Sequence, residues 1–308
     1  MADIFAFFPG QGSQKVGMGK ELYERFDIAK DLFSQADAAL GFSLSSICFE
    51  GPTEKLTLTE IAQPAILTVS VICFELAKAQ LESSHRIVAA AGHSLGEYSA
   101  LVAAGALSFS DAVKLVNKRG KFMQEAVPVG TGKMVAVLGK EVSEIETALA
   151  QVTSGVAQIA NINAPGQVVV AGSADGVTAF VNALGSAKVV ELTVSAPFHC
   201  SLMKPAEEKL RGELSQITIS TPKFPVIQNF TAEVSDAPEQ IRENLALQVC
   251  GRVRWVECVE RGIALGSPSA AWEFGAGNVL TGLAKRIAPS LSRVNIDSPD
   301  AIEKSLAA

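Results

Sequence analysis

The chain has 308 residues, which is enough for one large domain or for one domain that carries an insertion. Hydrophobic residues make up 48% of it and provide a sizeable core, so the composition argues against disorder. The net charge of -6 argues against a general nucleic-acid or membrane-surface binder. The cysteines show no C-x-x-C spacing, and we expect reduced thiols in a cytoplasmic protein: Cys48, Cys73, Cys200, Cys250 and Cys258.

The first part of the chain predicts a buried strand followed by helices. The strand covers residues 4–8, and the loop after it, residues 11–14, lies at a strand's carboxyl end, where α/β sheets place ligand sites. Its glycine spacing matches neither a Walker A loop nor G-x-G-x-x-G, so a phosphate loop is a weak interpretation. Helices are expected over roughly 18–82. The uncharged run 61–74 within them is too short to span a bilayer, and we interpret it as a buried helix.

The stretch Gly92-His93-Ser94-Leu95-Gly96 has the pattern G-x-S-x-G between an apolar run of strand length, 87–91, and an Ala- and Leu-rich segment of helix length. A sharp strand-to-helix turn lifts the Ser hydroxyl clear of the sheet, and the flanking glycines let the turn pack closely. Ser94 is therefore the candidate nucleophile. The free N–H of Leu95 and the positive end of the helix lie where an oxyanion would form. The alternative is a chance match in an Ala- and Gly-rich chain, but the context favours a functional turn.

A helix is expected from an N-cap within Ser108-Phe109-Ser110-Asp111 to about Val127. Charged residues recur on one face at helical spacing, and Arg119 falls in the middle of the opposite face, which also carries Met123. A buried arginine must be paired, because an isolated buried charge is costly. Its partner is either a carboxylate elsewhere in the chain, the commoner outcome, or a carboxylate on the substrate, whose two oxygens the planar guanidinium can hold at once.

The segment from about residue 130 to 195 predicts a separate unit with the order β-α-β-β-α-β, the ferredoxin-like unit. The expected strands cover 133–138, 156–162, 167–171 and 188–194, and the expected helices cover 142–152 and 174–184. We therefore predict a small subdomain over 130–196, inserted into a large α/β subdomain formed by 1–129 and 197–308. A cleft between two such bodies is a common location for a site.

The candidate general base is His199, which follows a rigid proline where the small subdomain ends. A Ser-then-His order matches the α/β hydrolases. His93 is expected to point off the other side of the turn, and His85 to be exposed in a polar connection. No acidic third member stands out, because Asp175 lies in the small subdomain and Asp236 precedes a helix. A backbone carbonyl could orient the imidazole instead and leave a dyad.

The last third of the chain predicts a return to the large subdomain. Its expected elements are strands over 224–230 and 270–274 and helices over 239–249, 253–265 and 279–287. The G-x-G at 275–277 is a poor cofactor signal, since tight strand-to-helix packing explains it as well. No metal-binding cluster is visible in the sequence, so neither a metal nor a permanently bound cofactor is expected.

Specific motifs now combine: Phe8-Pro9-Gly10-Gln11-Gly12-Ser13-Gln14, Gly92-His93-Ser94-Leu95-Gly96-Glu97, Asn163-Ala164-Pro165-Gly166-Gln167-Val168-Val169 and His199. With them the chain resembles the malonyl-CoA:acyl carrier protein transacylases of bacterial type II fatty acid synthesis, over essentially its whole length. The resemblance implies an α/β-hydrolase-like large subdomain with an inserted ferredoxin-like small subdomain. Generic esterases share only the G-x-S-x-G turn.

The resemblance also implies roles for particular residues. A malonyl group would move from malonyl-CoA to Ser94, the nucleophile, and then to the phosphopantetheine thiol of holo acyl carrier protein, with His199 as base. Gln11 and Leu95 would offer the oxyanion N–H groups, and the main-chain carbonyl of Gln248 would orient the histidine. Arg119 would grip the malonyl carboxylate. The implied substrate-binding residues are Arg119, Gln11, Met123, Asn163 and Phe198, the last at a position that varies with acyl selectivity in the family.

Two segments depart from the family pattern. Ala276 and Asn278 lie where the family often has Pro and Lys, and Cys250-Gly251-Arg252 is unlike the usual stretch after the glutamine. Both could alter contacts with coenzyme A or the carrier protein without touching the chemistry. Lys285 and Arg286 are candidate docking cations for an acidic partner, or else solvated helix residues. We expect a monomer that binds neither nucleic acid nor membrane.

Three other functions remain as alternatives. A related acyltransferase could load another extender unit or serve a polyketide pathway, and the sequence separates this poorly. A serine hydrolase or thioesterase would release the acyl group to water and need no carboxylate on its substrate. A non-catalytic carrier-protein binding module would need neither Ser94 nor His199, so the presence of both counts against it.

Overall fold

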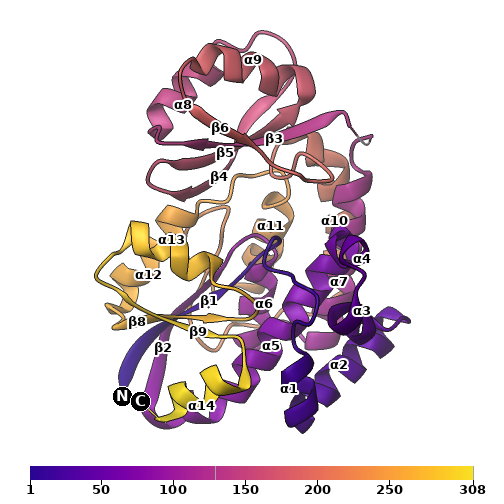
Figure 1. Cartoon of the computed structure of the whole chain (residues 1–308), viewed down its shortest axis with the longest axis vertical. Helices are drawn as coiled ribbons and strands as arrows, with labels where there is room; N and C mark the ends of the chain where they lie inside the picture. Colours follow the sequence, from indigo (N-terminus) through magenta and orange to yellow (C-terminus); the bar gives the residue numbers. More distant parts are fainter. Residues whose placement is uncertain (129, 308) are drawn as a thin grey trace.

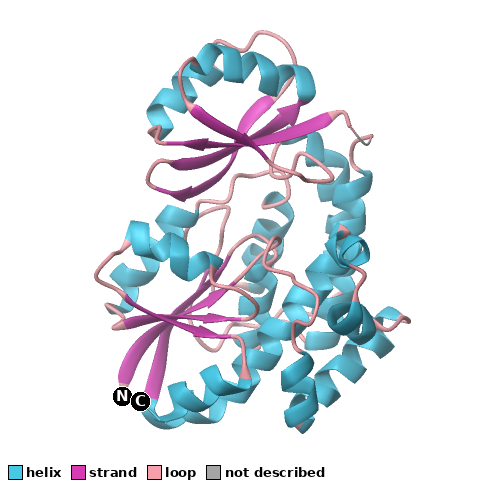
Figure 2. Cartoon of the chain, in the orientation of Figure 1, coloured by secondary structure: helices cyan, strands magenta, loops and turns pink. Residues whose placement is uncertain are grey.

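The protein has an α/β fold in which two β-sheets lie one above the other along the longest axis of the molecule (Figure 1). The structure is a computed structural model of the chain and describes residues 1–128 and 130–307. Helices flank both sheets, and loops lie between them (Figure 2). The functional site described below is built from these loops and from the strand ends that they extend.

Within the described residues the larger sheet has five strands, all parallel, in the order β7-β2-β1-β8-β9. Their bounds are β1 Ala2–Phe8, β2 His85–Gly92, β7 Val226–Ile227, β8 Ala270–Phe274 and β9 Ser292–Ile296. A parallel sheet covered by helices buries its strands on both faces, which explains the near-continuous apolar runs of β1 and β2.

The helices around the larger sheet include the predicted ones and several that the sequence analysis did not separate. They are α1 Lys20–Arg25, α2 Asp27–Leu40, α3 Leu44–Glu50, α4 Thr53–Thr57, α5 Thr59–Ser84, α6 Gly96–Ala103, α7 Phe109–Glu125, α10 Lys204–Leu214, α11 Pro238–Leu247, α12 Trp255–Gly266, α13 Val279–Ile287 and α14 Pro299–Ala307, with a short 3-10 turn at Ser201–Met203. The N-cap predicted within residues 108–111 is confirmed and is Ser108, whose side chain accepts a hydrogen bond from the Asp111 N–H.

The side chains of strand β1 pack into two separate cores, because successive side chains point to opposite faces of the sheet. Ile4, Ala6 and Phe8 pack into the core that includes α5 and α6. Phe5 and Phe7 pack into the core that includes α12 and α13. The central strand is therefore held from both sides, and the loop that leaves its carboxyl end starts from a rigid support.

The smaller sheet is antiparallel, with the strand order β4-β5-β3-β6. Its elements follow in the expected chain order as β3 Gly132–Leu138, α8 Val142–Leu149, β4 Ala157–Ala164, β5 Gln167–Ser173, α9 Ala174–Leu184 and β6 Lys188–Glu191. Val135 and Val170 on one face of the sheet pack with Phe180 of α9. Met134 and Val169 on the other face line a cavity between the two sheets.

The small sheet and its helices span Gly132–Glu191, which falls inside the predicted range of 130–196. The predicted boundary between 129 and 130 falls at Val129, and the predicted third segment ends at Ala308. Both residues lie outside the described part of the chain.

Several predicted elements were too long, and some were missed. The strand expected over 224–230 is paired only at Val226–Ile227, because Gln228 and Asn229 leave the sheet and hydrogen-bond Glu97 instead. The strand expected over 188–194 ends at Glu191, since the next residues line the cavity. Helix α8 ends at Leu149 rather than at residue 152. The elements α10, β9 and α14 were not predicted.

Helix α5 is the buried helix that the sequence predicts around residues 61–74. The expectation that this segment is too short to span a bilayer was wrong on length, because Thr59–Lys78 is long and apolar enough to cross a membrane. However, 83% of that segment is buried inside the protein, against α7, α6 and α2 among others. The bent pair α2 and α3 also passes the same test if it is counted as one span.

Candidate active site

Ser94 lies at the carboxyl end of β2 in a turn that only glycine neighbours allow. A Cβ on Gly92 would lie 1.9 Å from the backbone of Gly96, and a Cβ on Gly96 would lie 1.9 Å from the Phe8 carbonyl oxygen. Ser94 itself has a φ of 50°, in the left-handed region that non-glycine residues rarely adopt. Such a strained turn between a strand and a helix is the geometry expected of a nucleophile elbow.

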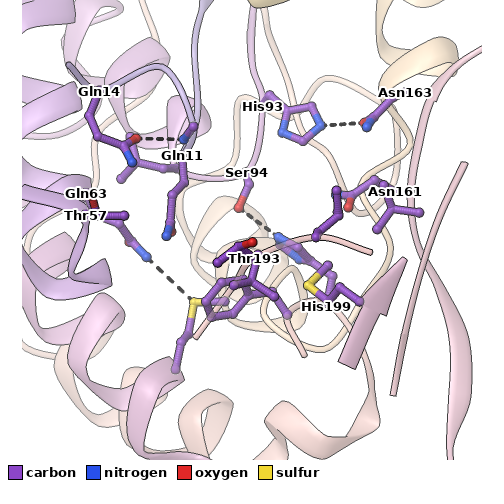
Figure 3. A pocket seen from close by; sticks show the side chains of 18 of the residues that line it. Gln11, Gln14, Thr57, Gln63, His93, Ser94, Asn161, Asn163, Thr193 and His199 are labelled. Atoms are coloured by element: carbon purple, nitrogen blue, oxygen red, sulfur yellow. Dashed lines mark hydrogen bonds between the residues drawn. The ribbon is translucent and has the colours of Figure 1, made fainter. Parts of the chain in front are cut away.

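Ser94 and His199 are in direct contact, as the sequence predicts. The distance between Ser94 Oγ and His199 Nε2 is 2.8 Å, and Figure 3 draws this hydrogen bond. His199 Nδ1 lies 2.9 Å from the main-chain oxygen of Gln248. Because a carbonyl only accepts, Nδ1 carries the proton and Nε2 accepts from the Ser94 hydroxyl. The imidazole is thus oriented to remove the hydroxyl proton.

The pKa of His199 is lowered, which favours the neutral imidazole that a general base requires. Burial, aided by the positive charge of Arg119, lowers this pKa from 6.5 to about 3. The imidazole is therefore unprotonated at neutral pH. Neither acidic residue considered from the sequence contributes, because Asp175 interacts with Ser173 in the small subdomain and Asp236 lines a different cavity.

Leu95 and Gln11 line the same cavity as Ser94, and each carries a backbone N–H. Leu95 follows Ser94 directly at the start of α6, and Gln11 belongs to the loop after β1. Both residues line a cavity of about 260 Å³ together with Ser94. Within residues 1–128 and 130–307 neither N–H donates to a protein acceptor. Both groups are therefore free to bind an oxygen that carries developing negative charge.

Arg119 extends from the buried face of α7 and contacts Ser94. Its Nη2 lies 3.1 Å from Ser94 Oγ and 2.9 Å from Gln248 Oε1, and its Nη1 lies 2.8 Å from Gln63 Oε1. The side chain is only 1% exposed, and the Tyr98 ring lies 5.4 Å from its Cζ. In the described part of the chain no carboxylate forms an ion pair with Arg119. The commoner of the two predicted outcomes, a structural ion pair, is therefore not found.

The remaining predicted substrate residues also line this cavity. Met123 accepts a weak hydrogen bond from Gln63 at 3.9 Å, and Phe198 forms part of the wall next to His199. Asn163 extends from the small subdomain, and its Oδ1 lies 2.8 Å from His93 Nε2 (Figure 3). The cavity thus lies between the two sheets, with walls from both.

Two expectations about histidines were wrong. His93 does not point off the far side of the turn but lines the same cavity as Ser94, where it hydrogen-bonds Asn163. Burial lowers its pKa, which makes a protonated role at neutral pH unfavourable. His85 is not in a loop but begins β2, where its ring lies 4.8 Å from the Trp272 ring.

Three polar residues of this site were not predicted. Gln63 was visible only as a polar residue in an apolar helix, and Asn229 gave no sequence signal. Asn229 Oδ1 accepts from the Ser94 N–H at 2.7 Å and so supports the turn. Glu97, the last residue of the quoted motif, is fully buried beneath it. A buried carboxylate so close to a nucleophile is a signal that the motif could have provided.

One of the two segments that depart from the family pattern, residues 250–252, contributes to a cavity that His199 also lines. Arg252 pairs with Glu146 at 3.5 Å and lines a second cavity of about 310 Å³, with His199 and Cys250 on its wall. Ala276 is buried, and Asn278 precedes α13.

The two candidate docking cations differ in their surroundings. Arg286 donates to Gln167 Oε1 at 2.6 Å and to the Pro165 carbonyl, so it ties α13 to the turn between β4 and β5. Lys285, the neighbouring cation, is exposed. Arg286 therefore already has a structural role, whereas Lys285 faces solvent.

The cysteines do not compete with Ser94 as nucleophiles. All five are free thiols, and four of them are buried. Burial raises the pKa of Cys200, the neighbour of His199, to about 11 and that of Cys250 to about 12. Thiols with such pKa values are almost entirely protonated at neutral pH. In the part of the chain that the structure describes, no cluster of His, Cys, Asp or Glu could hold a metal ion.

Comparison with known proteins identifies relatives along the whole chain. The family model of the acyl transferase domain matches residues 5–255. The malonyl CoA-acyl carrier protein transacylase of Bacillus subtilis is 46% identical, over 99% of this chain and 97% of its own. The protein of the same name from Escherichia coli K12 is 43% identical, over 98% of both chains.

Solved structures agree with these relatives. The malonyl CoA-acyl carrier protein transacylase of Coxiella burnetii superposes with a TM-score of 0.95 at 39% identity, over 100% of this chain and 98% of its own. A malonyl-transacylase in complex with a holo type II polyketide synthase acyl carrier protein superposes with a TM-score of 0.94 at 39% identity, over 100% of this chain and 99% of its own. The chain therefore belongs to the malonyl CoA-acyl carrier protein transacylase family of acyl transferases.

Proposed function

We propose that this protein transfers the malonyl group of malonyl-CoA to the phosphopantetheine thiol of holo acyl carrier protein in fatty acid synthesis, through a malonyl ester of Ser94. Family membership supports the reaction class. The observation that carries the substrate is Arg119, a buried guanidinium that lies 3.1 Å from the nucleophile and forms no ion pair with a carboxylate of the described residues. A carboxylate on the substrate would form the ion pair that this guanidinium lacks.

The first half of the reaction loads the enzyme. Ser94 Oγ attacks the thioester carbonyl carbon while its proton passes to His199 Nε2, and Gln248 holds the imidazole through its carbonyl. The N–H groups of Gln11 and Leu95 receive the negative oxygen of the tetrahedral intermediate. The C–S bond then breaks, and the coenzyme A sulfur takes the proton from His199. A positioned base contributes about 10²- to 10⁴-fold and each oxyanion donor about 3 kcal/mol.

The second half reverses these steps with a different thiol. His199 takes the proton of the phosphopantetheine thiol, and the sulfur attacks the malonyl ester carbonyl. The C–O bond to Ser94 breaks, and His199 returns the proton to Ser94 Oγ. The overall reaction exchanges one thioester for another, so its free-energy change is close to zero. Water competes with the thiol as the acceptor of the malonyl group.

We propose the finer description of the fold on the same basis. The parallel sheet with the nucleophile turn after β2 supports an α/β-hydrolase-like large subdomain. The strand order β4-β5-β3-β6 with α8 and α9 on one face supports a ferredoxin-like small subdomain over 130–196. We further propose that Met123, Asn163 and Phe198 contact the acyl group or pantetheine arm. We also propose that the protein acts as a cytoplasmic monomer.

The test is the intact mass of the protein after brief incubation with malonyl-CoA or with acetyl-CoA, followed by holo acyl carrier protein. We expect a malonyl adduct that is lost in Ser94→Ala and that moves to the carrier when the carrier is added. Acyl release to water with no transfer and no preference for malonyl would instead support a serine hydrolase. Equal loading of branched extender units would support the related acyltransferases.

A further inference from the structure

Two opposite charges are buried beneath the nucleophile without touching each other. Arg119 is 1% exposed and Glu97 is 0% exposed. Among the described residues neither takes part in an ion pair. A buried charge with no compensation is costly, so each of these two groups requires a counter-charge nearby.

The side-chain amide of Gln248 joins them. Its Oε1 accepts from Arg119 Nη2 at 2.9 Å, and its Nε2 donates to Glu97 Oε2 at 2.7 Å. A guanidinium only donates and a carboxylate only accepts, so the amide has one favourable orientation between them. The Gln248 side chain therefore lies between the two charged groups and hydrogen-bonds both of them.

The carboxylate of Glu97 is well satisfied on its other sides. Oε2 also accepts from the Asn229 N–H at 2.8 Å, and Oε1 accepts from Gln228 Nε2 at 3.3 Å. Glu97 lies in the first turn of α6, where the helix dipole favours a negative charge. Burial raises its pKa to about 7, although these hydrogen bonds and the charge of Arg119 act to lower it. The group is ionised above that pH.

We infer that Glu97 is the counter-charge of Arg119 in the empty site and a positioning residue for malonyl recognition. It compensates the guanidinium through Gln248, so that no protein carboxylate occupies the position that the substrate carboxylate needs. A carboxylate in direct contact would hold the guanidinium more tightly and compete with malonate. This inference rests on the proposed function, because it assumes that Arg119 receives the malonyl carboxylate.

Two variants test it by removing or moving the charge. Glu97→Gln removes the protein counter-charge that we infer for Arg119. The malonyl carboxylate would then be the counter-charge of this buried guanidinium. The KM for malonyl-CoA should fall about fivefold, and kcat for transfer to the carrier should fall by a similar factor, because the malonyl enzyme is held more tightly. The values for acetyl-CoA should change by a clearly smaller factor, because acetyl-CoA presents no carboxylate to Arg119.

The double variant Glu97→Gln with Gln248→Glu keeps the number of buried charges but places the carboxylate against Arg119. The ratio of malonyl to acetyl loading rates should fall at least about tenfold, because the protein carboxylate now blocks the substrate carboxylate. Since its net charge is unchanged, this variant tests the inference even if the single variant does not fold. Neither change removes the main-chain carbonyl of Gln248 that accepts from His199. Because Gln248→Glu also removes a donor to the Ser94 carbonyl, the readout is the malonyl-to-acetyl ratio rather than the rate.

Glu273→Gln is the matched control. Glu273 is also 0% exposed, but its carboxylate accepts from the N–H groups of Leu280 and Thr281 at the start of α13. This control should lower the melting temperature and leave the malonyl-to-acetyl ratio unchanged.

The experiment measures loading by intact mass over a range of malonyl-CoA and acetyl-CoA concentrations at about pH 8, where Glu97 is ionised. Wild type is measured first, and a wild type that does not prefer malonyl refutes the proposed function itself. If wild type prefers malonyl but the charge-moved variant keeps the same ratio, the inference is overturned. It is also overturned if Glu97→Gln changes malonyl and acetyl kinetics by equal factors, as a purely structural role would.

Discussion

Arg119 Nη2 and Ser94 Oγ lie 3.1 Å apart, so the group that would receive a carboxylate touches the atom that would attack a carbonyl. In a malonyl thioester a single methylene separates the carboxylate from the reacting carbonyl. A longer dicarboxylate would carry its charge past the guanidinium, and an acetyl group would leave it unsatisfied. The short distance between these two side chains therefore suits malonyl among simple acyl groups.

The first prediction concerns Arg119 itself. Arg119→Ala should lower kcat/KM for malonyl-CoA by at least about thirtyfold, because truncating one partner of a buried charge pair costs about 2 kcal/mol or more. The loss for acetyl-CoA should be smaller. Arg119→Lys keeps the charge but loses the planar fork, and it should recover only part of the selectivity. Loading rates from stopped reactions followed by mass spectrometry measure both. An unchanged malonyl-to-acetyl ratio in Arg119→Ala would show that the residue is structural.

The second prediction concerns pH. The pKa of His199 is about 3 in the folded protein against 6.5 in an unfolded chain, so between these values the unfolded state takes up a proton that the folded state does not. The stability that His199 contributes is complete above pH 6.5 and is lost as the pH falls toward 3.

Melting temperatures of wild type and His199→Asn across this range measure the effect. Wild type should lose more stability on acidification than the variant does. With acetyl-CoA, which bears no carboxylate, loading should show no decline centred near pH 6.5. A decline centred there would mean that the imidazole is not desolvated as the structure indicates.

The contact between Ser94 and His199 could be predicted from the sequence because its signals are local. Ser94 lies in a five-residue pattern between a strand and a helix, and His199 follows a proline where the inserted unit ends. The groups that hold them come from distant positions. Gln63 is 56 positions from Arg119, and Asn229 is 135 positions from Ser94. Only the folded sheet brings these residues together, so no pattern in a single segment indicates them.

The burial of Arg119 was predicted from helical spacing, but the nature of its partners was not. Spacing shows which side of α7 faces inward, and it says nothing about what lies opposite. The structure places two glutamine oxygens there, and the nearest buried carboxylate lies beyond Gln248. The cost of a buried charge predicts that Arg119 needs compensation, whereas only the three-dimensional arrangement shows which groups provide it.

The third prediction compares two helical glycines. In Gly96→Ala the new methyl group would lie 1.9 Å from the Phe8 carbonyl oxygen, so β1 and the nucleophile turn cannot both keep their positions. We expect a large loss of stability and no acylation of Ser94. In Gly282→Ala on α13 the new methyl group would meet no described atom within 4 Å outside its chain neighbours and its own helix backbone, and the change should stabilise by about 0.5–1 kcal/mol with full activity. Thermal unfolding and loading assays decide. Activity in Gly96→Ala would contradict the close packing at this turn.

The last prediction concerns the carrier protein. Lys285 is exposed on α13 beside Arg286, which is already engaged with Gln167 and Pro165. If Lys285 meets an acidic carrier, Lys285→Glu should slow transfer to holo acyl carrier protein about three- to tenfold at low salt, and less at high salt, because rim charges act mainly on encounter. Loading by malonyl-CoA should not change. Lys114→Glu, a charge reversal on the exposed face of α7, is the matched control and should leave both steps unaffected. Equal effects of the two substitutions would mean that net charge, rather than a docking contact at α13, governs transfer.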